Sequence, residues 1–580
     1  MMMVPFLLSL LPCLTISSAF ALPSLINQSA PCTYSFWNTE VKGSVTSDGA
    51  CRYTVEYAKA ERWGESSINW DISNQSFSEL PPACPQPSGG YTSGSSISED
   101  CLFATVYIPQ SANTSSSLPV FVWVHGGSFM EGSASAPGLD GSKLATKGNM
   151  IVIVLQYRLG VLGFLAPSSA AAWTDPNLGL RDVILALKGI NQGIRFVGGD
   201  ADKVTIGGQS SGASLIRALW GSPAAKGLFR AAILQSDPMS YGFATQSITA
   251  RVRDTFFAQQ PLASCTTLDC LRAIPVSQII TAQTQLTETV IYSVQGLPIS
   301  EPIRPTYESV TLPQDPTKQL FDDPSTLTFP PSNLPLLITT VKNEGGSAAQ
   351  GMFAKPVPID PNTYYATLAA LVGPQRAKSV VSNSHYALPN QTGYGARGDT
   401  FRESFDKAVT DGIWKCPNRD VASKWATAGG KVWVGEWEQG ATYPGNADDG
   451  SYCSTQGRVC HEDDIYTTFG TAPNPSSNTS VLEDNIFTYW SSFINHLDPN
   501  PSVGKRDCVP PSSLSQGTTA RNIQVEKRGT SNAAWEAYTS EEDVFPLNSS
   551  GDGSVDGEGV TTCLEGFWGV ESQYDWQLYG

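Results

Sequence analysis

One pentapeptide of this sequence has the residue types and the setting of a catalytic nucleophile. Gly-Gln-Ser-Ser-Gly at residues 208–212 follows the apolar run Val204–Gly207 and precedes the helical pattern Ala213–Trp220. A serine on a sharp turn between a strand and a helix projects its hydroxyl into the cleft above the sheet. The pattern therefore predicts attack by Ser210 on a carbonyl carbon. Without that setting, the same letters would indicate only a Gly/Ser turn.

A second motif supplies the hydrogen-bond donors that such an attack needs. The apolar run Val120–Val124 is followed by His-Gly-Gly-Ser-Phe at residues 125–129. Consecutive glycines after a strand let backbone N–H groups turn inward. Donors of this kind stabilise the negative charge that develops on a carbonyl oxygen during attack. The segment is therefore predicted to contribute to an oxyanion hole.

Both motifs require a sheet whose strands end at one edge. Six short apolar runs lack the polar alternation of a half-exposed strand, and helical patterns such as residues 178–194 separate several of them. This arrangement predicts an α/β protein with a large, mostly parallel central sheet covered by helices on both faces. The ligand site of such a sheet lies beyond the C-terminal ends of its strands. The runs are Val120–Val124, Met150–Leu155, Val204–Gly207, Ala231–Gln235, Leu336–Val341 and Val432–Glu436.

Further segments resemble the type-B carboxylesterase/cholinesterase family of α/β-hydrolases, and within it the secreted fungal carboxylesterases. Besides the two motifs, these segments are Ser-Glu-Asp-Cys-Leu at 98–102, Tyr-Arg-Leu-Gly-Val-Leu-Gly-Phe at 157–164 and Gly-Gly-Asp at 198–200. The similarity extends from Tyr57 to Gly470. It implies an α/β-hydrolase fold, which we expect to form a single domain over residues 22–580.

The resemblance also implies the other two members of a catalytic triad. The family acid lies just after a later strand, where Lys-Asn-Glu-Gly-Gly at 342–346 places Glu344. The family base lies in a His-x-x-(Asp/Glu)-Ile segment, which residues 461–465 match, and this assigns His461. Ser, Glu and His is the chain order expected of this fold.

The implied chemistry is hydrolysis of a small-molecule carboxylic ester by water through an acyl-enzyme, without a cofactor. His461 would take the proton of Ser210 and give it to the leaving alcohol, while Glu344 would fix the tautomer of the imidazole and stabilise the imidazolium. Three backbone N–H groups would bind the oxyanion: those of Gly127, Ser128 and Ser211.

The number of histidines supports the assignment of the base without reference to the family. The sequence holds four, and the other three have different settings. His125 belongs to the glycine motif, His385 has no strand before it, and His496 follows an apolar helical pattern whose end it marks. With so few histidines and no Cys-x-x-Cys pair, no metal site is expected.

Three residues depart from the family pattern. Ser128 replaces the last glycine of a Gly-Gly-Gly run and Ser211 replaces an alanine, and at both positions the mechanism requires only the N–H. Gln209 stands where the family commonly has Glu beside the nucleophile. A neutral amide attracts cationic substrates less than a carboxylate does and stabilises the imidazolium less. The sequence therefore disfavours a choline-ester specialist.

Two alternatives remain to a hydrolase of small to medium soluble esters. In interfacial lipases of the family, the loop closed by the first disulfide forms an apolar flap. Here residues 85–100 are rich in Gly and Ser and lack an amphipathic pattern, which argues against a lipase or sterol esterase. Binding or adhesion members of the fold usually lack a triad residue, whereas all three are present here. The acyl and alcohol parts of the substrate are not predicted.

Composition restricts the partners of the chain. Its 580 residues, of which 41% are hydrophobic, can bury a large core, and its formal net charge is −17. Nucleic acids and anionic membranes bind clustered Lys and Arg, so neither is expected as a main partner. The oligomeric state is not predicted.

The N-terminus predicts secretion. Residues 1–21 lack charged side chains, contain the apolar run Val4–Leu14 and end in Ala-Phe-Ala, which indicates a signal peptide cleaved after Ala21. A membrane anchor is the alternative, but the run is shorter than the roughly 20 apolar residues of a span. Secretion would make six Asn-x-Ser/Thr triplets candidate glycosylation sites: Asn27, Asn74, Asn113, Asn390, Asn478 and Asn548.

Twelve cysteines fit an oxidising compartment. Cys13 would leave with the signal peptide. The family resemblance implies the disulfides Cys84–Cys101 and Cys265–Cys270, and Cys32–Cys51 would close a hairpin. Five cysteines remain, which can form at most two bridges, and the simplest pair beside the base is Cys453–Cys460. The five are Cys416, Cys453, Cys460, Cys508 and Cys563.

Overall fold

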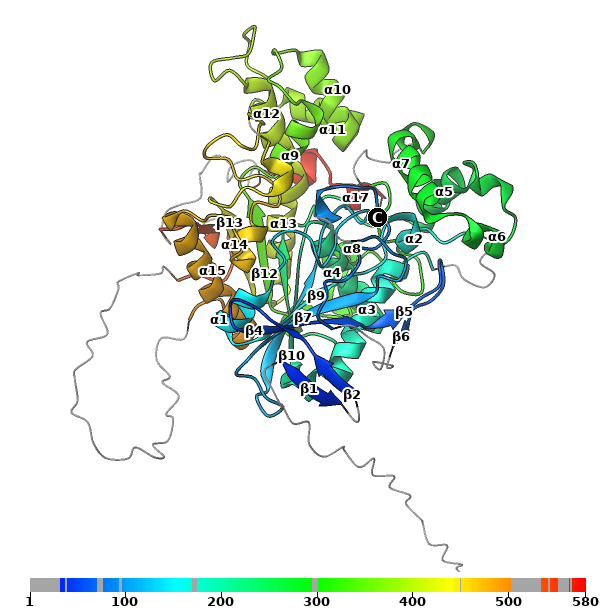
Figure 1. Ribbon diagram of the computed structural model, residues 1–580. Coiled ribbons are helices and arrows are strands. Elements are labelled where there is room, and N and C mark those ends of the chain that lie inside the picture. The colour runs from blue at the N-terminus through cyan, green and yellow to red at the C-terminus, as the bar shows by residue number, and fades with distance from the viewer. Residues whose placement is uncertain are drawn as a thin grey trace, which may run out of the picture.

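The protein is built around one large sheet (Figure 1). The computed structural model describes residues 32–36, 39–69, 77–92, 96–168, 175–294, 301–448, 450–501, 534–540, 543–550, 563 and 566–579. Ten strands follow the order β14-β13-β12-β11-β10-β8-β9-β7-β4-β3. Their bounds are β3 Ser44–Val45, β4 Ala50–Glu56, β7 Phe103–Pro109, β8 Leu118–Val124, β9 Ile151–Leu155, β10 Gly199–Gln209, β11 Ala231–Gln235, β12 Leu336–Val341, β13 Val432–Trp437 and β14 Phe545–Leu547. Two small ribbons pair β1 Thr33–Phe36 with β2 Thr39–Lys42, and β5 Ala58–Lys59 with β6 Ser67–Ile68.

The strands from β14 to β9 run parallel, and β7, β4 and β3 are antiparallel. Each of the six predicted apolar runs lies on a parallel strand, so the predicted α/β fold with a mostly parallel sheet is confirmed. The antiparallel edge was not predicted, because β4 and β7 mix polar with apolar residues and have only part of their residues buried.

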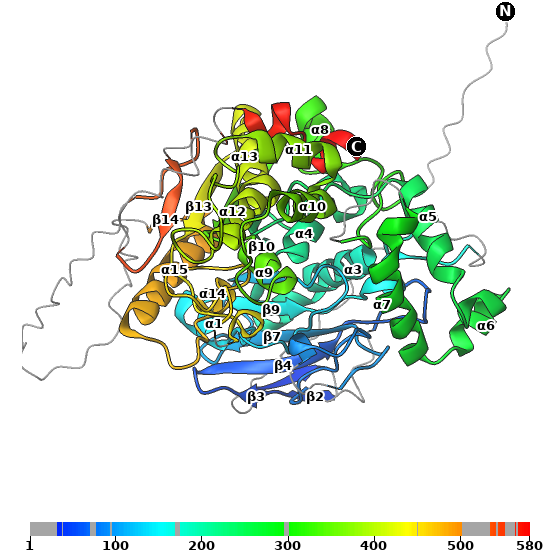
Figure 2. The ribbon, with the colours of Figure 1, turned by 90° about the horizontal axis from the view of Figure 1, so that it is seen from above.

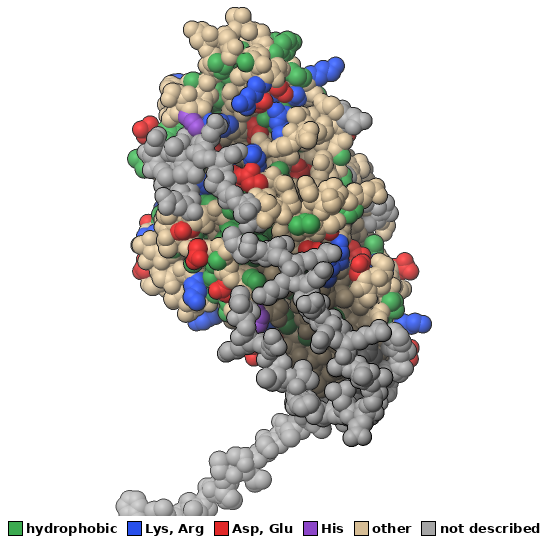
Figure 3. Space-filling view, turned by 90° about the vertical axis from the view of Figure 1, so that its left-hand side faces the viewer, with side chains coloured by type: hydrophobic (Ala, Val, Ile, Leu, Met, Phe, Trp, Pro, Cys, Tyr) green, Lys and Arg blue, Asp and Glu red, His purple; other side chains and the backbone are tan. Residues whose placement is uncertain are grey.

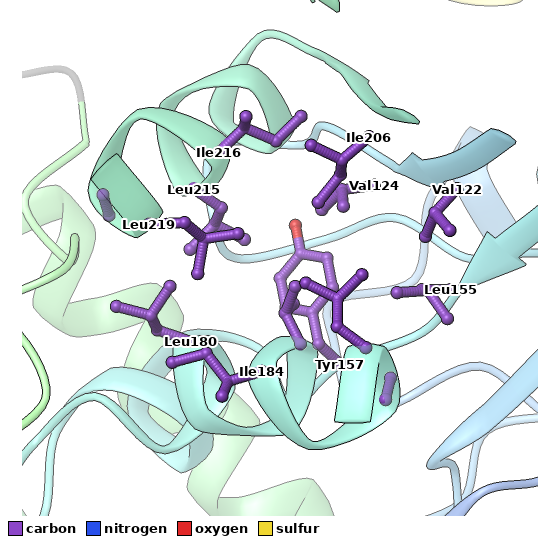
Figure 4. Close-up of a cluster of buried hydrophobic side chains, with 14 of the residues drawn as sticks. Val122, Val124, Leu155, Tyr157, Leu180, Ile184, Ile206, Leu215, Ile216 and Leu219 are labelled. Carbon is purple, nitrogen blue, oxygen red and sulfur yellow. The ribbon is translucent and has the colours of Figure 1, made fainter. Parts of the chain in front are cut away.

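Both faces of the sheet are buried, as strand β8 illustrates. Its Val120, Val122 and Val124 belong to one hydrophobic core, and the alternate residues Phe121 and Trp123 belong to a second. The first core lies against α3, α4, α8 and α13, and the second against α1, α14 and α15. Figure 4 shows part of the first core, between the strands, α3 and α4. The helices are α1 Ser142–Gly148, α3 Leu178–Gly193, α4 Ser211–Gly221, α8 Pro316–Asp322, α13 Cys416–Thr427, α14 Ile465–Phe469 and α15 Ser477–His496.

Two groups of helices lie outside these layers (Figures 1 and 2). One consists of α5 Gln246–Phe257, α6 Leu268–Ala273 and α7 Val276–Ser293. The other consists of α9 Gly346–Met352, α10 Pro361–Val372, α11 Pro374–Ser382 and α12 Thr400–Val409, and it shares a third hydrophobic cluster with the C-terminal Phe567 and Trp568. The described residues also form two short helices, α2 Gly160–Phe164 and α17 Asp575–Tyr579. Among the helices described, none is long and apolar enough to cross a membrane.

Five disulfides join the ten cysteines that the structure describes: Cys32–Cys51, Cys84–Cys101, Cys265–Cys270, Cys416–Cys563 and Cys453–Cys460. The first three and the last are the pairs considered from sequence. Cys416–Cys563 links residues 147 positions apart and was left unassigned. Cys508 lies outside the described residues, as does the predicted signal peptide.

The predicted glycosylation acceptors differ in their setting. Asn113, Asn390 and Asn478 are exposed, and Asn548 is half-buried. Asn27 and Asn74 lie outside the described residues. On the described part of the face in Figure 3, acidic and basic side chains are interspersed with one another.

Candidate active site

The predicted nucleophile lies on a strained turn between β10 and α4. Ser210 has φ 56° and ψ −129°, a left-handed conformation that is unfavourable for a residue with a Cβ. Its N–H donates to Gln235 O at 2.9 Å, which fixes the turn to the neighbouring strand. A Cβ on Gly212 would lie 2.2 Å from Val124 O, so only glycine lets helix α4 start this close to β8. The strand, turn and helix predicted around Ser210 are all present.

The predicted oxyanion loop passes directly beside this turn. A Cβ on Gly126 would lie 3.0 Å from the Cβ of Ser210. The next three residues, Gly127, Ser128 and Phe129, have φ values of 108°, 53° and 61°. Three consecutive positive φ values curl the backbone after β8, and the two non-glycine residues make this conformation costly. The loop therefore needs contacts that hold it in place.

The predicted acid and base are hydrogen-bonded to each other. His461 Nδ1 lies 2.5 Å from Glu344 Oε2, and Glu344 Oε1 accepts from the backbone N–H of Val341 at 2.9 Å. Glu344 follows β12 and is buried, and His461 lies on the loop before α14. With the Nδ1 proton donated to Glu344, His461 Nε2 accepts from the side-chain amide of Gln209 at 3.2 Å. Between the described side chains of Ser210 and His461 there is no hydrogen bond, although Gln209 and Ser210 are neighbours.

The loops that carry acid and base are tied together. Asn343 N donates to Val459 O at 2.9 Å, and Val459 N donates to Asn343 Oδ1 at 3.2 Å. The disulfide Cys453–Cys460 ends directly before His461. A Cβ on Gly346 would lie 2.4 Å from Cys460 Sγ, so the acid loop packs against the disulfide. The sequence-based idea that a bridge at Cys460 fixes the loop of the base agrees with this packing.

The electrostatic setting of His461 is acidic. Burial opposes protonation, but the charge of Glu344, the hydrogen bond to it and the charges of Glu462 and Asp464 raise the pKa of His461 to about 9. Burial in turn raises the pKa of Glu462 and that of Asp464 to about 7, and the pKa of Asp463 to about 6. A base accepts a proton only in its neutral form, so the fraction of competent His461 increases with pH.

Sequence reasoning missed one residue of this site. The ring of Trp414 lies 5.3 Å from the ring of His461, measured between centroids. Trp414 belongs to a π-helical turn, η7 Thr410–Lys415, between α12 and α13. Such turns interrupt helices frequently at functional sites. No spacing of apolar residues signals a π-helical turn, so the sequence offered no pattern from which to place Trp414.

Comparison with known proteins identifies the family of the chain. Residues 57–550 match the model of the carboxylesterase family. The chain belongs to the carboxylesterase family. The resemblance drawn from the sequence motifs is thereby confirmed, and membership makes carboxylic ester hydrolysis the expected class of reaction.

Individual carboxylesterase relatives cover different shares of the chain. Para-nitrobenzyl esterase of Bacillus subtilis is 38% identical over 45% of this chain, and the match spans 51% of that enzyme, about half its length. A probable N-octanoylanthranilate hydrolase of Rhodococcus erythropolis is 29% identical over 78% of this chain and 90% of its own. A solved structure of a PNB esterase superposes with a TM-score of 0.64 and 28% identity, covering 82% of this chain and 93% of its own. This carboxylesterase therefore has the α/β-hydrolase fold.

Proposed function

We propose that this carboxylesterase is a secreted serine hydrolase that cleaves small to medium soluble esters through Ser210, His461 and Glu344. The observation that carries the proposal is the 2.5 Å contact between His461 Nδ1 and Glu344 Oε2 beside the strained turn of Ser210. An imidazole held by a buried carboxylate at one nitrogen has its other nitrogen available as a general base.

The reaction follows from these positions. His461 Nε2 takes the hydroxyl proton as Ser210 Oγ attacks the ester carbonyl carbon, and then gives that proton to the departing alcohol. The N–H groups of Gly127, Ser128 and Ser211 stabilise the oxyanion. Water attacks the acyl-enzyme by the same route and releases the acid. Because Nε2 contacts the Gln209 amide in the absence of substrate, the imidazole must exchange this partner for Ser210 Oγ.

The loop between Cys84 and Cys101 supports soluble esters over a lipid interface. Gln86 Nε2 donates to Gly132 O at 2.8 Å and Gln86 Oε1 accepts from Gly132 N at 3.0 Å, both buried. The Tyr91 hydroxyl donates to Glu462, next to the base. Opening this loop as a flap would break these bonds and leave buried polar groups unpaired. Within its described residues the loop contains a single short 3₁₀ turn, Gly90–Thr92, and no amphipathic helix.

Secretion rests on separate observations. Disulfides persist in oxidising compartments, and ten described cysteines are paired. The exposure of Asn113, Asn390 and Asn478 is compatible with glycosylation. The net charge of −17, with acidic and basic side chains interspersed on the face of Figure 3, supports a small-molecule substrate over nucleic acid.

The proposal is tested by a fluorophosphonate probe combined with a panel of substrates. We expect the probe to label Ser210, located by mass spectrometry of the labelled peptide, because only an activated serine reacts. We also expect the enzyme to hydrolyse dissolved p-nitrophenyl esters. With a long-chain triglyceride as substrate, emulsification should not cause an abrupt increase in the rate of hydrolysis. Absence of labelling would favour a binding protein of this fold, and interfacial activation would favour a lipase or sterol esterase.

Gln209→Glu is expected to move the acid limb of the kcat/KM profile to higher pH. A carboxylate at the position of the Gln209 amide, 3.2 Å from His461 Nε2, stabilises the imidazolium and raises the pKa of the base. A shift of about one unit would lower kcat/KM on the acid side roughly tenfold. The measurement is a pH profile for a neutral ester. Gln209→Met, which removes the amide without adding charge, is the control and should not shift the limb upward. An unchanged limb in the glutamate variant would refute this role.

A further inference from the structure

We infer that the hydroxyl of Ser211 positions the oxyanion hole by bracing, together with Tyr157, both ends of the loop formed by residues 125–129. Sequence reasoning assigned only the backbone N–H of Ser211 to the hole, and the side chain at this position replaces the alanine usual in the family. The inference rests on the proposed function, because an oxyanion hole acts only if Ser210 is the nucleophile.

Two buried hydrogen bonds hold the two ends of the loop. The N–H of Phe129, the last loop residue, donates to Ser211 Oγ at 3.1 Å. The Tyr157 hydroxyl donates to the carbonyl oxygen of His125, the first loop residue, at 2.8 Å. Burial raises the pKa of the Tyr157 phenol, so that its hydroxyl keeps the proton that it donates to His125 O. Each end of the loop is thus held by one buried hydrogen bond.

All four residues are buried, so water does not substitute for these partners. Ser211 and Tyr157 are fully buried, Phe129 is 1% exposed and His125 is 4% exposed. In Figure 4 the Tyr157 ring stands in the core between α3 and α4, with its hydroxyl directed away from Leu180 and Ile184 and toward Val124. Its ring also stacks on that of His125, with centroids 4.7 Å apart. Tyr157 therefore holds the start of the loop by both its ring and its hydroxyl.

The loop needs this support because its conformation is unfavourable. Ser128 and Phe129 are non-glycine residues with φ values of 53° and 61°. The carbonyl oxygen of Phe129 accepts from Gly160 N at 2.7 Å, so both backbone groups of Phe129 are held, one by Gly160 and one by Ser211. Without the Ser211 hydroxyl, the buried N–H of Phe129 loses its acceptor, and such a group is costly to leave unpaired.

Ser211 connects the two parts of the hole. Its backbone N–H lies at the start of α4 and is one donor of the hole. Its Oγ holds the loop that carries the other two donors, the N–H groups of Gly127 and Ser128. The spacing between the donors is thus fixed through one side chain. Donors act on a developing oxyanion only when they are preorganised at its position. Ser211 is therefore a positioning residue. Removal of its hydroxyl should destabilise the transition state more than it weakens substrate binding.

Ser211→Ala is expected to lower kcat for a p-nitrophenyl ester roughly tenfold, with KM changed less than about twofold. A second readout is the inhibition constant of a trifluoromethyl ketone. Ser210 Oγ adds to its carbonyl carbon, its proton passes to His461, and the resulting oxyanion occupies the hole. We expect the affinity for this inhibitor to fall by the same factor as kcat/KM, which a general loss of stability would not produce.

The matched control is Ser214→Ala, which removes another buried hydroxyl from α4. The Ser214 hydroxyl donates to Asp237 at 2.6 Å and makes no hydrogen bond with residues 125–129, so both readouts should stay near wild type. Tyr157→Phe keeps the stacked ring and tests the other end of the loop independently. Its effect on kcat should be less than additive with that of Ser211→Ala, because both hydrogen bonds hold the same loop.

The outcomes separate this inference from the proposed function. A wild-type protein inactive on all esters would contradict the proposed function. If the wild type is active, two results would contradict the inference alone. One is a Ser211→Ala variant that keeps the wild-type kcat and inhibitor affinity. The other is full additivity of the effects of Ser211→Ala and Tyr157→Phe on kcat. If Ser211→Ala fails to fold, Tyr157→Phe with wild-type kcat and inhibitor affinity would still overturn it.

Discussion

Replacing Ser210 by alanine is expected to abolish ester hydrolysis, with kcat/KM for a short p-nitrophenyl ester falling by roughly 10⁴-fold or more. The serine supplies the oxygen that forms the ester bond of the acyl-enzyme, and an alanine at this position, on the turn between β10 and α4, has no nucleophilic atom. The residual rate would come from substrate binding and the oxyanion hole alone. Steady-state kinetics with p-nitrophenyl acetate or butyrate measures the loss directly.

The control for this experiment is the unfolding midpoint of the variant, which shows whether the fold is retained. Ser210 is 7% exposed, and its side chain makes no hydrogen bond to any described residue, so truncation to alanine should leave the unfolding midpoint close to wild type. The fluorophosphonate probe should no longer label the variant. Turnover near that of wild type would show that the nucleophile lies elsewhere and would remove the basis of the proposed mechanism.

Glu344→Gln is expected to lower kcat by roughly 10³- to 10⁴-fold. Glu344 Oε2 holds the Nδ1 proton of His461 at 2.5 Å, which leaves Nε2 as the acceptor. A glutamine can present its NH₂ group to Nδ1 instead, which favours the tautomer protonated at Nε2, and that tautomer cannot accept the proton of Ser210. The change also removes the carboxylate charge that raises the pKa of His461.

The pH profile separates the two effects of Glu344. With the pKa of His461 near 9, kcat/KM of the wild type should increase with pH and level off above about pH 9, because only neutral imidazole acts as base. Loss of the Glu344 charge lowers that pKa, so the acid limb of the variant should move toward the ordinary histidine value of about 6.5. The plateau should nevertheless stay far below that of wild type.

Glu462→Gln is the matched control for Glu344→Gln. Glu462 is half-buried next to His461 in the chain and also raises its pKa, but its side chain accepts from Tyr91 and makes no hydrogen bond with Nδ1. This variant should shift the acid limb downward while retaining kcat within about tenfold of wild type. A Glu344→Gln variant that behaves in the same way would contradict the role of Glu344 as the triad acid.

The sequence specified those parts of the site that depend on local chain order. Ser210 could be placed because a strand, a sharp turn and a helix are consecutive in the chain, and each has its own pattern of apolar residues and glycines. The parallel sheet could be predicted for the same reason, from runs such as those of β8 and β9 that are apolar on both faces. Glu344 needed the family resemblance and His461 was supported also by the small number of histidines, since nothing local connects residues 117 positions apart.

Contacts between distant segments were decided only by the tertiary structure. Cys416 and Cys563 meet because α13 and the C-terminal segment pack together, and no spacing rule links residues 147 apart. Trp414 reaches His461 through a π-helical turn, whose extra residue shifts side chains off the ordinary helical faces. The role of the Ser211 hydroxyl depends on Phe129 and Tyr157, which come from the ends of two other strands.

These outcomes have one physical origin. Hydrophobic periodicity and turn geometry act over a few residues, so the sequence by itself determined the strands, the nucleophile turn, the glycine loop and the acidic charge of this carboxylesterase. Hydrogen bonds between loops depend on how the sheet brings strand ends together, and their distances are not encoded in any one segment. Tertiary structure alone decided which side chains hold the base and which brace the oxyanion loop.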